Sequence, residues 1–325
     1  MTSEPTRGTA KIGGMSSVLR RAKKRTRPIR RKARRLTSAA RMLPSFLIIG
    51  AQRAGTTSLF AYVGRHPDVE LPRDADGSLH WVKELHFFDD NYWRGTDWYR
   101  AFFPLVLRQR AARLRGRNLA CGEATPYYLF HPAVPERVAA TLPDVRLIAL
   151  LRNPVERAYS HYQHSRKLNV EKLSFEEAVE AEAGRLGGLE EELSKEQPRT
   201  TAKGHRAHHH HLHRAYVTRS LYADQLERWL EHFPREQLLV VRSEDFLVQP
   251  DETFAQVFAF LGVRPWKVPS YEARNVGSYA PIDPEFRARL EARFAEPNAR
   301  LSELLGRDFG WAPVAGTSQA ERRSA

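Results

Sequence analysis

The feature that most constrains the fold of this chain is residues 45–60, SFLIIGAQRAGTTSLF. An apolar run of strand length breaks at Gly50, and three hydroxyl residues after Gly55 begin an expected helix. A loop between a buried strand and a helix N-terminus presents unpaired backbone N–H groups and the positive end of the helix dipole. These residues therefore predict an anion of phosphate or sulfate size, held between loop and helix.

The loop has the glycine spacing of a nucleotide-binding phosphate loop, but not its cation. In the pattern G-x-x-x-x-G-K-[ST] a Lys follows the second Gly, and the next hydroxyl holds magnesium. Here Thr56 replaces that Lys, and the cation comes earlier, as Arg53. A second expected strand, 146–151, ends in Arg152 rather than in a magnesium-binding Asp. Two arginines can neutralise phosphates without a metal, so a metal-free anion site is predicted.

Apolar runs along the chain predict alternating strands and helices. We expect strands at 46–49, 119–122, 146–151 and 237–241, and helices at 56–65, 132–142, 154–167, 221–233, 250–261 and 284–294. This alternation is typical of a mainly parallel sheet with helices on both faces, a P-loop-like three-layer α/β/α fold. Ligands of such sheets bind at the carboxyl ends of the strands, where Gly50, Glu123 and Arg152 are expected.

The net charge of +14 is concentrated at the N-terminus. Residues 1–43 contain fourteen Lys or Arg and one acid, giving +13, and the rest of the chain carries only +1. We expect a disordered basic tail over 1–43, a domain over 44–313 and a disordered tail over 314–325. The basic tail is either a passive solubilising arm or an attachment to anionic membrane, nucleic acid or another polyanion.

Length and composition fit one α/β core. The chain has 325 residues, of which 42% are hydrophobic, enough for one sizeable core. No apolar run approaches the ~18 residues of a membrane span, and no apolar core follows the basic residues as in a signal peptide. We therefore expect a cytoplasmic protein, peripheral at the membrane if its tail binds lipid. The single Cys121 excludes an intrachain disulfide and is expected to be a small buried residue.

Seven segments in order resemble the sulfotransferases that use 3′-phosphoadenosine 5′-phosphosulfate (PAPS), most closely the heparan-sulfate glucosaminyl N- and 3-O-sulfotransferase branch, in a bacterial-like form. They are GAQRAGTTSL, VKELHFFD, NYWRGTDWYRAFFP, GEATPYYLFHPAVPERV, LLRNPVERAYSHY, RSLYADQLERW and EPNARLSELLGRDFGW. The resemblance covers about 44–311 and implies PAPS as donor, 3′-phosphoadenosine 5′-phosphate (PAP) as product, and no metal. It implies a hydroxyl acceptor, or less readily an amine.

Two positions depart from the family pattern. Arg53 stands where the family usually has a Lys that stabilises the leaving phosphate, and Arg does not readily donate a proton. Ala124 stands where the animal heparan-sulfate enzymes carry an additional Lys that contacts the sulfated chain. Because the folded body is nearly neutral, a less charged glycan, a glycolipid or a small hydroxylated metabolite fits at least as well as a highly anionic polysaccharide.

Sulfuryl transfer needs a cradle for the donor, a cation at the leaving phosphate and a base. The resemblance implies that Arg152 and Ser160 bind the 3′-phosphate of PAPS. It also implies that a segment containing Arg219 and Tyr222 helps to bind the nucleotide. Arg157 and Arg166 are expected on the helix surface. The complete expected donor site is Gln52, Arg53, Ala54, Gly55, Thr56, Thr57, Ser58, Arg152, Ser160, Tyr222, Arg274, Gly277 and Ser278.

The expected base lies in 83–89, KELHFFD, where a carboxylate and an imidazole alternate around apolar residues. In an extended segment Glu84 and His86 point to one side, so both would face one cleft. The resemblance assigns the base to Glu84, with His86 beside it. The alternative is a solvated Lys–Glu pair next to two core phenylalanines. The expected catalytic residues are Glu84, His86, Arg53 and Lys83, and the expected acceptor contacts are Glu84, Asp89, Glu123 and Thr125.

Between 184 and 214 the chain turns polar and includes histidines at 208–211 and at His213. Five histidines suggest a metal site, but no carboxylate or Cys spacing organises them. We prefer a mobile surface insertion over the active-site mouth, which would gate the acceptor if it moves. Two functions from other classes remain as alternatives: a magnesium-dependent nucleotide kinase, and a polyanion- or membrane-binding protein that works through its basic tail.

Overall fold

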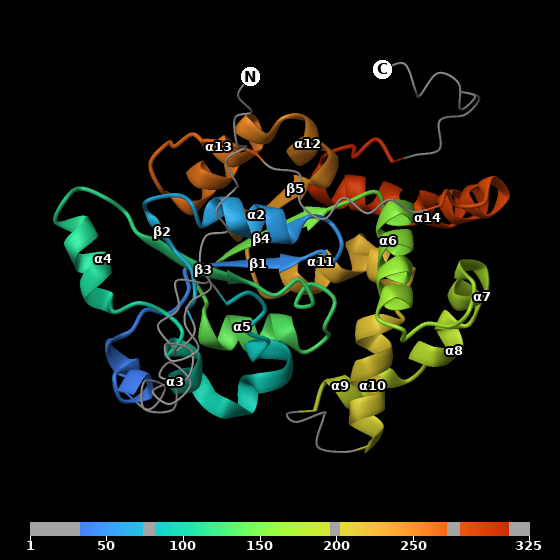
Figure 1. Cartoon of the computed structure of the whole chain (residues 1–325), viewed down its shortest axis with the longest axis horizontal. Coiled ribbons are helices and arrows are strands. Elements are labelled where there is room, and N and C mark those ends of the chain that lie inside the picture. Colours follow the sequence, from blue (N-terminus) through green and yellow to red (C-terminus); the bar gives the residue numbers. More distant parts are fainter. Residues whose placement is uncertain (1–32, 74–81, 196–201, 272–279, 312–325) are drawn as a thin grey trace, which may run out of the picture.

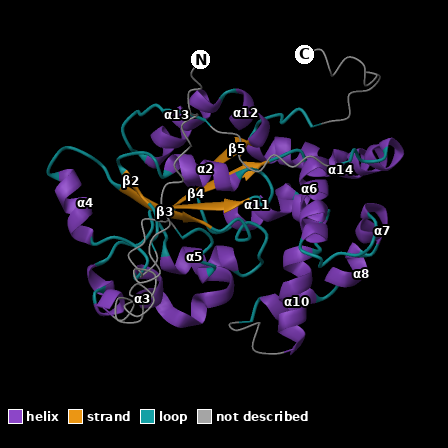
Figure 2. Ribbon diagram, in the orientation of Figure 1, coloured by secondary structure: helices purple, strands orange, loops and turns teal. Residues whose placement is uncertain are grey.

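A five-stranded parallel sheet forms the centre of this computed structural model, which describes residues 33–73, 82–195, 202–271 and 280–311 (Figures 1 and 2). The strand order is β2-β3-β1-β4-β5. Strands β1 and β3 are buried at every position, and β4 is buried after its first residue, which explains their continuous apolar or small-residue sequences. The strands are β1 (Phe46–Gly50), β2 (Val69–Glu70), β3 (Ala120–Ala124), β4 (Arg146–Leu151) and β5 (Leu238–Arg242).

Helices cover both faces of the sheet, which confirms the three-layer α/β/α architecture (Figure 1). Helix α2 (Thr56–Val63) follows β1 on one face, and α5 (Val134–Thr141) and α11 (Tyr222–Leu230) connect to the next strands on the other. The longer helices are α6 (Pro154–Lys167), α13 (Pro250–Leu261) and α14 (Pro284–Leu305). The shorter ones are α3 (Gly95–Arg100), α4 (Val106–Arg113), α7 (Phe175–Glu180), α8 (Glu182–Leu186), α9 (Leu189–Leu193), α10 (Ala202–His213) and α12 (Ser243–Val248).

The observed bounds confirm the positions of all the expected strands and helices. Strand β4 and helices α6 and α13 match residue for residue, while α14 runs past the expected end at 294 and continues through Pro297. A Pro inside a helix costs about 3 kcal/mol. Phe294 and Leu301 are buried on either side of it, so packing outweighs that cost. Strand β2 was not predicted, because two residues give no visible periodicity.

A glycine sets the closest approach within the sheet. Gly122 of β3 lies beside Phe46 of β1, and a Cβ at Gly122 would come within 2.4 Å of the Phe46 carbonyl oxygen. Only glycine therefore allows β3 to pair with β1 at this register. The neighbouring Cys121 is fully buried, as expected from its apolar context.

Part of the expected N-terminal tail packs on the domain. Residues 33–36 are helical, Ser38 and Met42 are buried, and Arg41 bridges to Leu105. The Ser38 hydroxyl donates to the Asp97 carboxylate at 2.8 Å, and Met42 N donates to the Pro104 carbonyl at 2.9 Å. The folded body thus begins before residue 44, because the Ser38 side chain and the Met42 backbone find partners on α3 and on the chain that follows it. The expected tails at 1–32 and 314–325 lie outside the described residues.

The His-rich region is more deeply packed than a surface insertion. Helix α10 carries the histidines, and His208 and His211 are buried. His211 Nδ1 lies 2.7 Å from the Tyr127 hydroxyl, and its ring stacks on Phe130 with centroids 4.0 Å apart. The expectation of a surface segment is therefore wrong for these residues, since aromatic contacts bury them. No three His, Cys, Asp or Glu side chains in the described part of the chain are placed to hold a metal ion.

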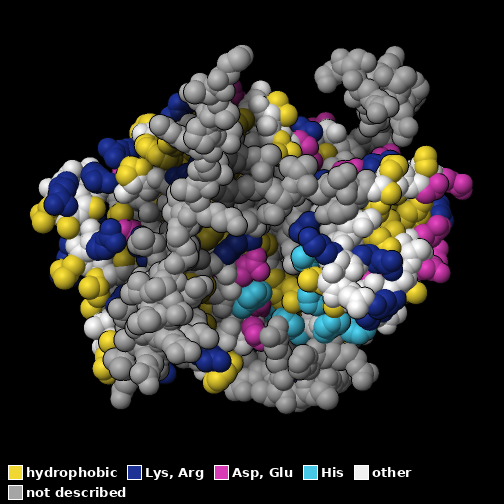
Figure 3. Space-filling model, viewed as in Figure 1, with side chains coloured by type: hydrophobic (Ala, Val, Ile, Leu, Met, Phe, Trp, Pro, Cys, Tyr) yellow, Lys and Arg dark blue, Asp and Glu magenta, His cyan; other side chains and the backbone are white. Residues whose placement is uncertain are grey.

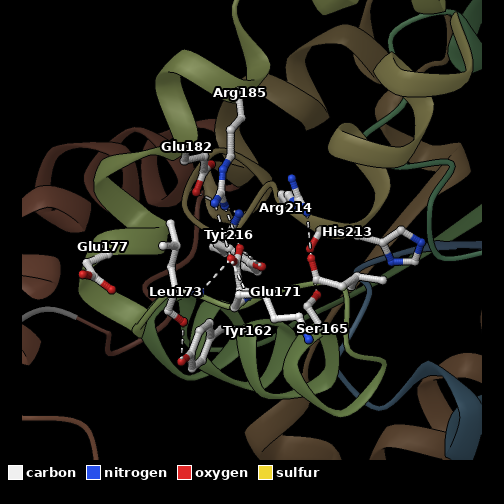
Figure 4. A network of polar contacts seen from close by, with 12 residues as sticks. Tyr162, Ser165, Glu171, Leu173, Glu177, Glu182, Arg185, His213, Arg214 and Tyr216 are labelled. Carbon is white, nitrogen blue, oxygen red and sulfur yellow. Dashed lines mark hydrogen bonds and ion pairs between the residues drawn. The ribbon is translucent and has the colours of Figure 1, made fainter. Parts of the chain in front are cut away.

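Two buried carboxylates anchor the turn between α10 and α11 (Figure 4). Glu182 accepts hydrogen bonds from the backbone N–H groups of Tyr216, Val217 and Thr218, at 2.7–2.8 Å, and from the Thr218 hydroxyl. Glu171 pairs with Arg185 and accepts from the Tyr216 hydroxyl at 3.0 Å. Buried acceptors satisfied in this way fix the backbone that leads to Arg219. Within the described ranges, no helix combines the length and apolar character that crossing a bilayer requires.

Candidate active site

A cavity of about 570 Å³ opens at the carboxyl ends of the central strands. Figure 3 shows acidic, basic and histidine side chains gathered around the middle of this face. The cavity volume is within the range of typical small-molecule sites, about 300–1,000 Å³. The expected site residues that line it are Gln52, Arg53, Ala54, Gly55, Thr56, Thr57, Ser58, Lys83, Glu84, Arg152 and Ser160.

The loop after β1 turns sharply into α2. Gly55 precedes Thr56, the first helical residue, and has φ 97°, which glycine adopts without the strain of a side chain. The loop is fixed from the start of α12 by the Ser243 hydroxyl, which donates to the Ala54 carbonyl at 2.8 Å. The N-terminus of α2 therefore points its free N–H groups into the cavity, as an anion site requires.

Three cationic or hydroxyl side chains from separate segments meet beside this loop. Arg53 Nε donates to the Ser160 hydroxyl at 3.2 Å, and Arg152 donates to the Arg53 carbonyl at 3.4 Å. Arg152 follows the end of β4, and Ser160 lies in the second turn of α6. The strand end and the helix thus converge, as their sequence spacing predicts.

A polar chain runs from the phosphate-binding loop to the expected base. Lys83 Nζ donates to the Thr57 hydroxyl at 2.9 Å and to Glu84 Oε1 at 2.6 Å. The other Glu84 oxygen lies 3.7 Å from His86 Nε2, and His86 Nδ1 lies 2.6 Å from Asp89 Oδ2. Glu84 N also donates to the Ala124 carbonyl at 2.9 Å, which ties this segment to the end of β3.

The backbone of this segment is not extended, contrary to the prediction. Glu84 has φ 63° and His86 has φ 50°, and a π-helix follows at Phe87–Asn91. Glu84 and His86 still face each other, because two left-handed residues turn the chain back on itself. Together with Arg53, at φ 72°, they are three of the four non-glycine residues with positive φ in the described ranges. Such conformations cost about 1–3 kcal/mol each and concentrate at functional sites.

The electrostatics of this chain favour its charged forms. Burial opposes ionisation of Glu84, but the hydrogen bond from His86 and the charge of Lys83 outweigh it and lower the pKa of Glu84 to about 2. Burial also opposes protonation of His86, but the charge and hydrogen bond of Asp89, with those of Glu84, raise the pKa of His86 to about 10. The buried Asp89 has a lowered pKa, because His86 outweighs the effect of its burial. At neutral pH the site therefore holds two carboxylates around an imidazolium.

Three expected acceptor contacts are turned away from the cavity. Glu123 and Thr125 are fully buried, and Glu123 accepts hydrogen bonds from the hydroxyls of Tyr99, Tyr128 and Thr125. Burial raises the pKa of Glu123. Asp89 is also buried and faces His86. The prediction of acceptor contact is wrong for all three, since Glu123 and Thr125 form hydrogen bonds within the core and Asp89 is buried against His86.

Two nucleotide-segment residues lie behind the site rather than in it. Tyr222 is buried and donates its hydroxyl to the Arg152 carbonyl at 2.8 Å. Arg219 is buried, donates to the Gln52 side-chain oxygen and stacks on Tyr127 and Phe130. The prediction that Tyr222 contacts the donor directly is therefore wrong. Tyr222 instead positions the strand end that carries Arg152. Arg274, Gly277 and Ser278 lie outside the described residues.

The two arginines expected on the surface of α6 differ from each other. Arg157 is fully buried and donates Nε to the Ser220 hydroxyl at 2.6 Å, so its surface assignment is wrong. It faces the anchored turn before α11, which the sequence of α6 alone does not reveal. Arg166 is exposed and donates to the Lys172 carbonyl at 2.8 Å, as expected for a surface residue.

Several cavity residues were not predicted from the sequence. His164 lies one turn after Ser160 on the same face of α6, and this spacing of four could have identified it. Burial and the nearby charge of Arg53 lower the pKa of His164. Glu156 lies between two cations, 3.8 Å from Arg152 and 2.6 Å from Arg287. Arg287 comes from α14, and no local signal places it here. The other unpredicted lining residues are Tyr159, Ser243, Phe246, Leu247, Ala280, Pro281 and Ile282, while Pro126, from the segment expected to line the acceptor cleft, does line the cavity.

Comparisons with known proteins identify the family. The family model described as the sulfotransferase domain matches residues 43–271 of this chain. A solved sulfotransferase from Alicyclobacillus acidocaldarius is 31% identical with a TM-score of 0.59, covering 83% of this chain and 99% of that one.

Two curated proteins are also similar. The membrane-associated sulfotransferase kil1 of Dictyostelium discoideum is 28% identical, over 83% of this chain and 66% of that protein. The bifunctional heparan sulfate N-deacetylase/N-sulfotransferase 3 of Mus musculus is 30% identical, over 82% of this chain and 30% of that protein. This chain thus spans less than a third of the bifunctional mouse enzyme and about two thirds of kil1. The family resemblance read from the seven segments is confirmed, and this chain belongs to the sulfotransferase domain family.

Proposed function

We propose that this sulfotransferase transfers a sulfuryl group from PAPS to a hydroxyl, or less readily an amine, of a glycan, glycolipid or small molecule, by metal-free in-line displacement. The observation that carries the proposal is the convergence of an anion-binding loop, two arginines and a Lys-linked carboxylate in one cavity. When bound, PAPS supplies an activated sulfuryl group whose leaving group is a phosphate. The residues of this chain bind it, orient it and manage the proton.

The donor fits the cationic side of the cavity. The N–H groups at the start of α2 and the hydroxyls of Thr57 and Ser58 would hold the 5′-phosphosulfate. Arg53 would stabilise the leaving phosphate by charge, because a guanidinium does not readily give up a proton. Arg152 and Ser160 would bind the 3′-phosphate, with a planar donor group suited to phosphate oxygens.

Glu84 is the proposed base. Its side chain is 41% exposed in the cavity wall, and Lys83 joins it to the loop that would hold the donor. A pKa of about 2 keeps Glu84 ionised at neutral pH, so it is always in the form that accepts a proton. So weak a base takes the proton only as the acceptor oxygen bonds to sulfur and becomes acidic. His86 lies 3.7 Å from the second carboxylate oxygen, and its positive charge attracts Glu84.

The cavity and the relatives support the proposed acceptor class. Tyr159, Phe246 and Ile282 give part of the cavity an aromatic and apolar wall, which suits the faces of a sugar ring or a small hydroxylated molecule. A relative named as a heparan sulfate N-sulfotransferase supports a glycan. The nearly neutral body favours an acceptor with fewer charges than heparan sulfate.

Replacing Glu84 by Gln tests the assignment of the base. Glu84→Gln is expected to keep PAP affinity within about threefold and to lower turnover about 10² to 10⁴-fold, the usual effect of losing a general base. Glu252→Gln, an exposed change on α13, is the matched control. Turnover and PAP binding are measured on the same preparations.

His164 is the second candidate base, because it lines the same cavity and its lowered pKa keeps the ring neutral. Unchanged turnover in Glu84→Gln together with a comparable loss in His164→Gln would transfer the role to His164. Loss of PAP binding in both variants would instead show that these residues hold the donor.

A further inference from the structure

A second cavity, of about 190 Å³, lies outside the active site and is strongly basic. Arg34, Arg41, Arg73 and Arg108 line it, with Glu70 as its single acid, and it shares no lining residue with the active-site cavity. Arg34 and Arg41 donate to backbone carbonyls of the chain after α3. The walls between the arginines are apolar: Leu71, Phe102, Pro104 and Leu105.

Helix α4 continues this basic region. Residues 106–117, VLRQRAARLRGR, carry five arginines and no acid. Arg108 pairs with Glu70 at 2.6 Å, and Arg117 pairs with Asp68. Among the described residues, no ion pair neutralises the exposed arginines that remain, which are Arg110, Arg113 and Arg115. This folded surface is therefore locally basic, although the charge of the body as a whole is close to zero.

Exposed leucines accompany these arginines. Leu107 is 67% exposed, Leu114 is 90% exposed, and Leu36, two residues after Arg34, is 79% exposed. Leu107 and Leu114 are seven residues apart, so they lie on one side of the helix, two turns from each other. Figure 1 shows α4 standing at one end of the molecule beyond β2, and Figure 3 shows basic and hydrophobic side chains side by side there. We call Leu107, Arg110, Arg113, Leu114 and Arg115 the α4 face.

We propose that the α4 face is a docking surface for anionic phospholipid membranes. Basic residues interleaved with exposed apolar side chains are typical of helices that lie in the interface of a membrane. Arginines attract the headgroup phosphates, and the leucines enter the boundary of the acyl chains. Nucleic acid or a sulfated glycan would use the same arginines but would gain nothing from the leucines.

The N-terminal sequence reinforces this choice of partner. Residues 1–32 contain eleven Lys or Arg and one acid, and they join the described chain next to Arg34, which lines the basic cavity together with Arg108 of α4. The basic sequence therefore joins the described chain beside a cavity that α4 also lines, and its charges can add to those of the α4 face. Binding through two such elements is stronger than through either one.

Vesicle binding by the full chain tests the proposal. Sedimentation is measured with vesicles of phosphatidylcholine plus phosphatidylserine, and with phosphatidylcholine alone. The unsubstituted chain should bind the anionic vesicles and lose that binding as salt rises. Arg110→Gln/Arg113→Gln/Arg115→Gln should weaken binding on the order of 100-fold, at about fivefold for each arginine. Lys167→Gln/Arg289→Gln/Arg293→Gln removes the same charge from α6 and α14 and should stay within about threefold.

A leucine variant separates lipid from other polyanions. Leu107→Ser/Leu114→Ser keeps every charge and should weaken vesicle binding at least about tenfold, since apolar burial is lost, while retention on heparin beads stays unchanged. Circular dichroism and PAP binding verify that each variant is folded. The proposal is overturned if the arginine variant binds vesicles as well as its charge-matched control does, because the basic sequence before residue 33 would then suffice. It is also overturned if the leucine variant binds vesicles normally, which would leave a polyanion surface.

Discussion

Asp89 supports the charge of His86, and replacing it by Asn tests the electrostatics of the site. Asp89 is buried, and its Oδ2 lies 2.6 Å from His86 Nδ1. Although burial lowers the pKa of His86, the charge of Asp89 is the largest of the opposing effects, and the pKa rises from 6.5 to about 10. At 1.36 kcal/mol for each pKa unit, this corresponds to roughly 5 kcal/mol in favour of the imidazolium.

Asp89→Asn keeps the shape of the side chain and removes its charge. The pKa of His86 should fall by about two units or more, measured by NMR titration of the imidazole C–H signals. A histidine with a raised folded-state pKa stabilises the fold fully below its unfolded pKa of 6.5, and this contribution is lost as pH rises towards about 10. Urea unfolding at pH 6 should therefore show a loss of about 3–5 kcal/mol in the variant, and the loss should shrink towards pH 10.

Asp90→Asn is the matched control, one residue along the same π-helix. It should leave the pKa of His86 within about half a unit of its original value, because the charges that chiefly raise this pKa are those of Asp89 and Glu84. An unchanged pKa of His86 in Asp89→Asn, or equal decreases in both variants, would refute the argument that Asp89 charges His86.

Three further predictions concern the donor site and the sheet. Glu156→Gln should raise PAP affinity about threefold in calorimetry, since this carboxylate occupies Arg152 and Arg287; lowered affinity would show that it positions them instead. Arg152→Gln should weaken PAP about 10- to 100-fold while leaving 5′-AMP, which lacks the 3′-phosphate, unaffected; equal losses would remove Arg152 from that phosphate. Gly122→Ala should lower the free energy of unfolding by about 1–3 kcal/mol, because its Cβ meets the Phe46 carbonyl; unchanged stability would contradict the register.

The elements that could be predicted from the sequence have strong local signals. Strand β4 is a continuous apolar run after its first residue, and α6 and α13 begin with Pro154 and Pro250 at the first helical position. The short helices α8 and α9 lack such signals, and tertiary contacts, among them those of Glu182, stabilise them. Helix α7 does carry a local signal, the capping box of Ser174 and Glu177, which was missed. The predicted end of helix α14, at 294, came too early. Pro297 normally ends a helix, and only packing on both sides of it lets the helix continue.

The expected loop residues line the cavity because a strand, a loop and a helix contiguous in sequence must lie together. The mistaken contacts of Glu123 and Tyr222 have a different cause. A strand end or a motif gives the position of a residue, but not whether its side chain faces the cavity or the aromatic core. Arg287 was missed because its partner Glu156 is 131 residues away in the sequence, and no periodicity links them.

The most direct test of the central claim is calorimetric titration of the full chain with PAP in EDTA, with ATP as the comparison ligand. The cavity with Arg53, Arg152 and Ser160 predicts that PAP binds without metal and at least about tenfold more tightly than ATP, because only PAP carries a 3′-phosphate for Arg152. Absence of PAP binding, or a magnesium-dependent preference for ATP, would contradict the assignment of a PAPS site and would favour nucleotide phosphoryl transfer at this loop.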